Sequence, residues 1–161
     1  MSDNLNEEFL QQEEDDLAGK YLTFCVDSKI YGVELMHVKE IISIQSITAV
    51  PSTPDYVKGI INLRGGIVPV IEVRSKFNIP AIPYDERTCI IVLNISEMNV
   101  GLIVDEVSEV IEFEELSALP EVGKESSASQ YIKSVAEVKD KLVLNLDCEK
   151  FLNSDLIPTR F

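Results

Sequence analysis

The side chains that could carry out chemistry are few and scattered. The chain has one histidine, His37, and three cysteines, Cys25, Cys89 and Cys148, with no Cys-x-x-Cys pair. No nucleophile or orienting group can be tied to His37, and a metal site needs clustered His, Cys or Asp ligands. An odd number of distant cysteines, in or beside apolar runs, indicates reduced, buried thiols. These residues predict neither a catalytic dyad nor a metal site, so no cofactor is expected.

Three other patterns resemble functional motifs without completing them. Gly65-Gly66 is not followed by Lys-Ser or Lys-Thr, so it is not a phosphate-binding loop. The acids near the N-terminus lack the glycine and ligand spacing of a calcium loop. Glu40 and Glu109 occupy matching places in an internal repeat, which is a structural relation rather than a catalytic pair. We therefore expect a protein that is not an enzyme.

The segment Tyr56–Phe77, YVKGIINLRGGIVPVIEVRSKF, predicts a β-hairpin. Two β-branched runs flank Gly65-Gly66, and glycine accepts the positive φ of tight hairpin turns. Alternation along the first strand places Arg64 beside the turn, on the less apolar face. Two interpretations of Arg64 remain open, a solvated strand-end residue or a guanidinium that pairs with a partner's carboxylates and carbonyls.

Composition indicates what kind of partner the protein can have. The 161 residues carry a net charge of −14, which repels nucleic acid and anionic lipid surfaces. No apolar run approaches the length of a membrane span, and the acidic N-terminus lacks the features of a signal peptide. Residues 1–19 hold seven acids and no base and predict a flexible tail. Residues 153–161 are expected to form an irregular C-terminal tail.

Between these tails the chain reads as short β-strands with few helices. Strands are expected at 21–26, 30–35, 89–95, 100–104, 132–138 and 141–146, besides the hairpin. The apolar spacing changes at 36–42 and again at 105–111, which predicts short helical turns there. Residues 78–86 contain two prolines and read as a connector, and residues 148–152 as a closing helix.

The second half of this pattern repeats the first. A shift of 69 places Gly32 on Gly101 and Pro51 on Pro120, and after the polar loop a shift of 75 places Tyr56 on Tyr131. Each half is too small to be stable alone, so we expect two small closed five-stranded sheets that share an apolar seam. The first barrel would span about 20–80 and the second about 86–152. Because a duplicated pair can exchange a terminal strand, residues 21–26 could pair in either barrel.

The residues that carry these features resemble a known family. YGVELMHVKEII followed by a Val-Pro pair, the GxxNLRGxxxP core of the hairpin, and the later NVGLIVDEVSEVIEF and KLVLNLDCEKFL are similar to the CheW family of bacterial chemotaxis coupling proteins. The likeness covers residues 21–152. It implies two SH3-like barrels about a pseudo-twofold axis and a cytoplasmic protein recruited to membrane-associated chemoreceptor arrays.

The resemblance also implies partners and site residues. CheW-like proteins join the cytoplasmic tips of chemoreceptors to the regulatory domain of the histidine kinase CheA, and other CheW copies join the array rings. Receptor contact is implied for Val38, Glu40, Gly59, Arg64, Gly65, Cys89, Gly101 and Val110. Contact with the kinase or a neighbouring coupler is implied for Glu121 and Val122. Position 89 departs from the family, which usually has an aliphatic residue there.

Two alternative functions remain open at this stage. A CheW-like adaptor could serve a kinase pathway that governs pili or surface motility. A small-molecule or ion-binding regulatory barrel is a third hypothesis, from a different class of protein.

Overall fold

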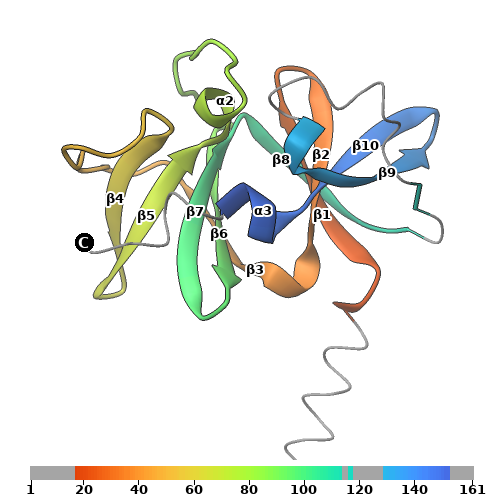
Figure 1. Ribbon diagram of the computed structural model, residues 1–161, viewed down its shortest axis with the longest axis horizontal. Helices are drawn as coiled ribbons and strands as arrows, with labels where there is room; N and C mark the ends of the chain where they lie inside the picture. Colours follow the sequence, from red (N-terminus) through yellow and green to blue (C-terminus); the bar gives the residue numbers. More distant parts are fainter. Residues whose placement is uncertain (1–16, 114–115, 118–128, 153–161) are drawn as a thin grey trace, which may run out of the picture.

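The computed structural model describes residues 17–113, 116–117 and 129–152, and these form a mainly β protein (Figure 1). The predicted tails at 1–16 and 153–161 lie outside the described residues, as do Glu121 and Val122. In the first half the elements are β1 Lys20–Val26, β2 Lys29–Glu34, η1 Leu35–His37, β3 Val38–Ser43, β4 Val57–Leu63, β5 Gly66–Glu72 and α2 Val73–Lys76. In the second half they are β6 Cys89–Ile95, β7 Met98–Val104, β8 Glu106–Glu112, η3 Ser129–Tyr131, β9 Ile132–Val138, β10 Lys141–Leu146 and α3 Cys148–Leu152.

The strand positions reproduce the repeat found in the sequence. β1 begins at residue 20 and β6 at residue 89, a shift of 69, whereas β4 begins at 57 and β9 at 132, a shift of 75. The hairpin predicted over residues 56–77 is confirmed as β4 and β5, and the closing helix as α3. Local patterning therefore specifies most elements.

The two halves exchange their first hairpins. One sheet, called sheet A here, has the order β8-β1-β2-β10-β9, and the other, sheet B, has the order β3-β6-β7-β5-β4. The β1–β2 hairpin thus lies in the sheet of the second half, and the β6–β7 hairpin in the sheet of the first. The division into barrels at about 20–80 and 86–152 is therefore wrong, because each sheet takes strands from both sides of the connector. The joints are parallel pairings, β2 with β10 and β5 with β7.

Each sheet curls until its edges approach each other. Beyond the edge strand β3, Thr48 exchanges two backbone hydrogen bonds with Ile60 of the opposite edge strand β4, with N···O distances of 2.9 and 2.8 Å. Ser117 and Val135 make the equivalent bridge in sheet A, with N···O distances of 2.9 and 2.7 Å. Curling protects the edge strands from pairing with other chains. The predicted fold of two five-stranded SH3-like subdomains is confirmed.

The two sheets contribute side chains to one shared core. Phe24 and Tyr31 of sheet A and Leu93 and Leu102 of sheet B are fully or almost fully buried in it. A separate cluster that includes Val70 and other aliphatic side chains fills the inside of sheet B. Since the shared core draws on both sheets, neither sheet keeps its hydrophobic face out of water alone.

An ion pair marks the place where the chain passes from sheet B to sheet A. Arg74 of α2 donates from Nε and Nη2 to the two carboxylate oxygens of Asp105, at 2.9 and 2.7 Å. Asp105 also accepts a hydrogen bond from the backbone N–H of Asp27 in the β1–β2 turn, at 2.9 Å. Burial alone raises the pKa of Asp105, but the bonds from Arg74 and Asp27 outweigh it and lower the pKa below its ordinary value. This pair fastens the two sheets together.

The helical turns predicted at 36–42 and 105–111 are wrong for most of their length, because these residues form the edge strands β3 and β8. A β-bulge explains the misleading spacing. Val38 pairs with Leu93 and Ile41 with Ile91, so an irregularity between Val38 and Glu40 places residues three apart on one face. Only the short 3₁₀ turn η1, Leu35–His37, is helical in the first of these segments.

Candidate partner-binding surface

Arg64 lies in the turn of the β4–β5 hairpin. Leu63 pairs with Gly66, so the two turn residues are Arg64 and Gly65, not the two glycines that the sequence suggested. Both have positive φ, 53° and 83°, as the type I′ hairpin turn requires. The backbone N–H of Gly65 donates to Oδ1 of Asn62 at 3.1 Å, which braces the turn. Arg64 is therefore presented at the end of a two-residue turn rather than on a strand.

Arg64 is anchored by Glu40 of the opposite edge strand. Its Nη1 donates to Oε2 of Glu40 at 2.5 Å, and the Arg64 side chain is 74% exposed whereas that of Glu40 is 17% exposed. An ion pair of this exposure contributes at most about 1 kcal/mol to folding, so its main effect is to fix the direction of the guanidinium. The other carboxylate oxygen of Glu40, Oε1, is buried without a hydrogen-bond partner. The other four N–H donors of the guanidinium can face an incoming carbonyl or carboxylate.

Exposed aliphatic side chains lie on both edge strands. Ile41 of β3 is 43% exposed and Val110 of β8 is 50% exposed. They are equivalent in the repeat, since 41 plus 69 is 110. Ile41 pairs with Ile91, and Val110 with Leu22, and both of these partners belong to the shared core. Ile41 and Val110 thus extend the core of the seam to the surface at the edge of each sheet.

Val38 connects the exposed residue Ile41 to the shared core. The side chain is half-buried and packs against the shared core, on the same face as Ile41. Its repeat equivalent, Val107, packs on the same core and pairs with Phe24. The rim of sheet B with Val38, Ile41 and Arg64, and the equivalent edge of sheet A with Val110, are together called the edge surface below.

The histidine and the three cysteines of the described residues offer little chemistry. Burial lowers the pKa of His37, with Glu149 opposing, and burial raises the pKa of Cys25 and of Cys89. Burial raises the pKa of Cys148 to about 12. Thiols with raised pKa values are poor nucleophiles at neutral pH. In the described ranges, no group of three or more His, Cys, Asp or Glu residues could hold a metal ion, and no helix is long and apolar enough to cross a membrane.

Comparison with known proteins decides the family. The family model described as CheW-like domain matches residues 20–156. The chain belongs to the CheW family. It is 36% identical to the chemotaxis protein CheW of Klebsiella aerogenes over 138 residues, covering 84% of this chain and 82% of that protein. It is 32% identical to the chemotaxis protein CheW of Bacillus subtilis over 138 residues, covering 84% of this chain and 88% of that one.

A solved structure shares the fold as well. The scaffolding protein TtCheW from Thermoanaerobacter tengcongensis superposes with a TM-score of 0.76 at 32% identity, covering 85% of this chain and 89% of that one. The resemblance inferred from the sequence motifs is thereby confirmed. As a member of the CheW family, the chain is a chemotaxis scaffold or coupling protein.

Within this CheW-family fold the residues predicted to contact receptor do not all share one surface. Val38, Glu40, Arg64 and Gly65 belong to the rim of sheet B, and Val110 lies on the equivalent edge of sheet A. Cys89 is half-buried at the start of β6, and its Sγ lies 3.2 Å from the carbonyl oxygen of Arg87. The structure therefore groups the first four and leaves Cys89 apart from Arg64.

Gly59 and Gly101 are buried inside sheet B, on either side of Val70. A Cβ on Gly59, where φ is 152°, would lie 2.2 Å from the carbonyl oxygen of Thr48. A Cβ on Gly101 would lie 2.7 Å from Cγ2 of Ile90. Both glycines allow strands to approach closely, so any effect on a partner acts through the shape of the barrel.

The exposed aliphatic residue Ile41 was not among the site residues predicted from the sequence. The signal was present, because Val110 was predicted as a site residue and the shift of 69 maps it onto Ile41. The segment was instead interpreted as a helical turn, in which Ile41 would belong to the buried face.

Proposed function

We propose that this chain couples chemoreceptors to a histidine kinase, binding the cytoplasmic receptor tip and the regulatory domain of CheA in the cytoplasm beneath membrane-associated arrays. Membership of the CheW family supports this role. The observation that carries the proposal is the edge surface, which presents an arginine paired with Glu40 and exposed aliphatic side chains on the edge strands of both sheets. A helical hairpin tip offers an apolar stripe and polar backbone ends to such a surface.

The exposure and charge of these side chains suggest different roles for the aliphatic residues and for Arg64. Burial of Val38, Ile41 and Val110 against a helix supplies affinity, because apolar area removed from water is the main favourable term. Arg64 supplies orientation, because a planar guanidinium pairs with oxygens in a fixed geometry. Glu121 and Val122, which lie outside the described residues, are proposed to contact the kinase or a neighbouring coupler. The chain acts by binding alone and has no catalytic role.

Co-sedimentation tests this function. Membranes bearing receptors are mixed with the chain, with CheA, or with both, and the pelleted protein is measured together with kinase autophosphorylation. We expect the chain to pellet with receptor membranes, and the kinase to pellet and come under receptor control only when the chain is present.

Two outcomes would contradict the proposal. Failure of the chain to pellet with receptor membranes would remove the receptor contact. Binding to a kinase of a pili or surface-motility pathway, without binding to CheA, would assign the adaptor to that pathway instead.

A further inference from the structure

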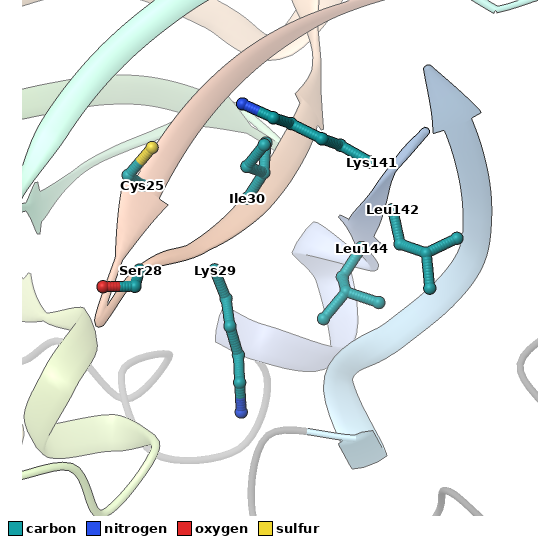
Figure 2. Close-up of a pocket in the computed structure, with 7 residues that line it drawn as sticks. All are labelled: Cys25, Ser28, Lys29, Ile30, Lys141, Leu142 and Leu144. Atoms are coloured by element: carbon teal, nitrogen blue, oxygen red, sulfur yellow. The ribbon is translucent and has the colours of Figure 1, made fainter. Parts of the chain in front are cut away.

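A cavity opens between two hairpin tips of sheet A, on the opposite half of the fold from Arg64. β2 and β10 run parallel and pair only from Ile30 and Val143 onward, so the β1–β2 and β9–β10 hairpins separate before that point. The gap between them is a cavity of about 580 Å³, lined by the residues drawn in Figure 2, among them Lys29, Ile30, Leu142 and Leu144. It is called the tip notch below.

The tip notch has an aliphatic floor and a basic rim. Figure 2 shows Leu142 and Leu144 of β10 facing the same open space as Lys29 of β2, while Lys141 reaches across Ile30 toward β1. Leu142 is 60% exposed, among the most exposed aliphatic side chains of the described residues. None of the described residues that line the notch is acidic, in a chain whose net charge is −14. The notch is therefore suited to a segment that is both apolar and acidic.

The repeat shows that this chemistry is particular to sheet A. Leu142 corresponds to Ile67 by the shift of 75, and Ile67 is 63% exposed on the matching hairpin of sheet B. The two lysines have no basic counterparts there, because Lys29 corresponds to Met98 and Lys141 to Gly66. The fold supplies the aliphatic position twice but the positive charge once.

We propose that the tip notch binds the acidic N-terminal segment of the same chain. The segment reads NEEFLQQEEDDL, in which the neighbours Phe9 and Leu10 are flanked by Glu7 and Glu8 on one side and by residues 13–16, all acidic, on the other. The two apolar side chains cover the aliphatic floor, and the flanking carboxylates face the lysines on the rim.

The chain is long enough for this contact. The notch lies at the end of β1, and the seven residues of that strand span about 23 Å at about 3.3 Å per residue. Phe9 lies eleven positions before Lys20, where β1 begins, and eleven extended residues cover at most about 40 Å. Phe9 can therefore reach the notch of its own molecule. Intramolecular contact is favoured, because a short tether gives a high effective concentration.

Nuclear magnetic resonance of the full chain, labelled with ¹⁵N, tests the proposal. In the double variant Phe9→Ser/Leu10→Ser we expect the amide signals of residues 28–30 and 141–144 to shift, while those of the β4–β5 hairpin stay in place. The variant Leu5→Ser is the matched control and should leave the notch signals unchanged. At about 0.5 M salt the wild-type notch signals should move toward those of the double variant, since surface charges are screened.

A reciprocal pair of variants examines the rim from the other side. Lys29→Glu/Lys141→Glu should shift the signals of residues 7–16, whereas Ile67→Ser on the matching hairpin should not. Notch signals that are identical in the wild type and in Phe9→Ser/Leu10→Ser would overturn the proposal. Notch signals that depend on protein concentration would overturn it too, because they would place the segment in the notch of a second copy.

Discussion

Ile41 and Val110 are repeat equivalents, and each is an exposed aliphatic residue on the edge strand of its sheet. Each pairs with a residue of the shared core, Ile91 and Leu22 respectively. The seam between the sheets therefore ends at the surface in the same way on both sheets. A chain built from an internal repeat carries two such positions, one in each copy of the repeat.

The first prediction concerns these two residues. Ile41→Asp and Val110→Asp should each weaken binding to receptor membranes or to the CheA regulatory domain by roughly tenfold, because a carboxylate at an apolar contact must be desolvated. The free energy of unfolding should change little, since both side chains are already exposed. Ile82→Asp, at a 44% exposed position in the connector, is the control. Equal binding by all three variants would show that neither strand edge takes part.

The second prediction separates the glycines. Gly59→Ala should lower the free energy of unfolding by at least about 2 kcal/mol, because the new methyl group meets the carbonyl oxygen of Thr48 and φ is positive. Gly65→Ala should lower it by only about 1 kcal/mol, since no atom lies within 4 Å of its Cβ position. Urea denaturation measures both. Equal stabilities would contradict the close approach of Thr48 to Gly59.

The third prediction concerns the joint between the sheets. Asp105→Asn removes the charge that Arg74 holds with two hydrogen bonds and should lower the free energy of unfolding by about 2 kcal/mol at neutral pH. Because the pKa of Asp105 is lowered in the folded state, its contribution is present above the ordinary value of 3.8 and is lost as pH falls through the folded-state pKa. Wild type and variant should therefore converge in stability at acidic pH.

The control for that joint is Asp85→Asn. Asp85 also pairs with an arginine, Arg87, but both side chains are about half exposed or more. Removing the charge there should leave the urea midpoint nearly unchanged. A pH-independent difference between wild type and Asp105→Asn would show that the variant acts through packing rather than through the ion pair.

The fourth prediction concerns thiol reactivity. Burial raises the pKa of all three cysteines, and that of Cys148 to about 12, so little thiolate is present at neutral pH. In the native protein, alkylation by iodoacetamide should be slow at every cysteine and slowest at Cys148. Peptide mass spectrometry measures the rate at each site. A rapid reaction at Cys25 or Cys89 would indicate an activated thiol and would weaken the case against catalysis.

Local sequence signals were enough to predict the hairpins and the closing helix. The run from Ile60 to Val73 has two stretches of β-branched residues on either side of a glycine turn. This pattern fits a hairpin better than a helix, so β4 and β5 follow from it directly. The spacing of apolar residues gave the wrong prediction at β3 and β8. A β-bulge in each pairing shifts one face of the strand by a residue, which imitates helical spacing. An irregularity of pairing is a property of two strands, and one strand's sequence does not contain it.

The exchange of hairpins also lies beyond local signals. β1 and β2 pair with each other in either arrangement, whereas the pairings of β1 with β8 and of β2 with β10 distinguish the exchanged fold. The same limit applies to the site. The family resemblance selected Val38, Arg64 and Val110, which the structure places on strand edges and a turn, but also Gly59 and Gly101, which it places inside a barrel.

The most direct test of the adaptor role is receptor control of CheA autophosphorylation, reconstituted with receptor membranes and either the wild-type chain or Arg64→Glu. The variant breaks the ion pair with Glu40 and places a negative charge in the turn. Lys139→Glu is the matched control, because Lys139 is the repeat equivalent of Arg64 and has a similar positive φ of 50°. We predict that Arg64→Glu stays folded and loses receptor control of the kinase, whereas Lys139→Glu retains it. Normal receptor control with folded Arg64→Glu would contradict the account.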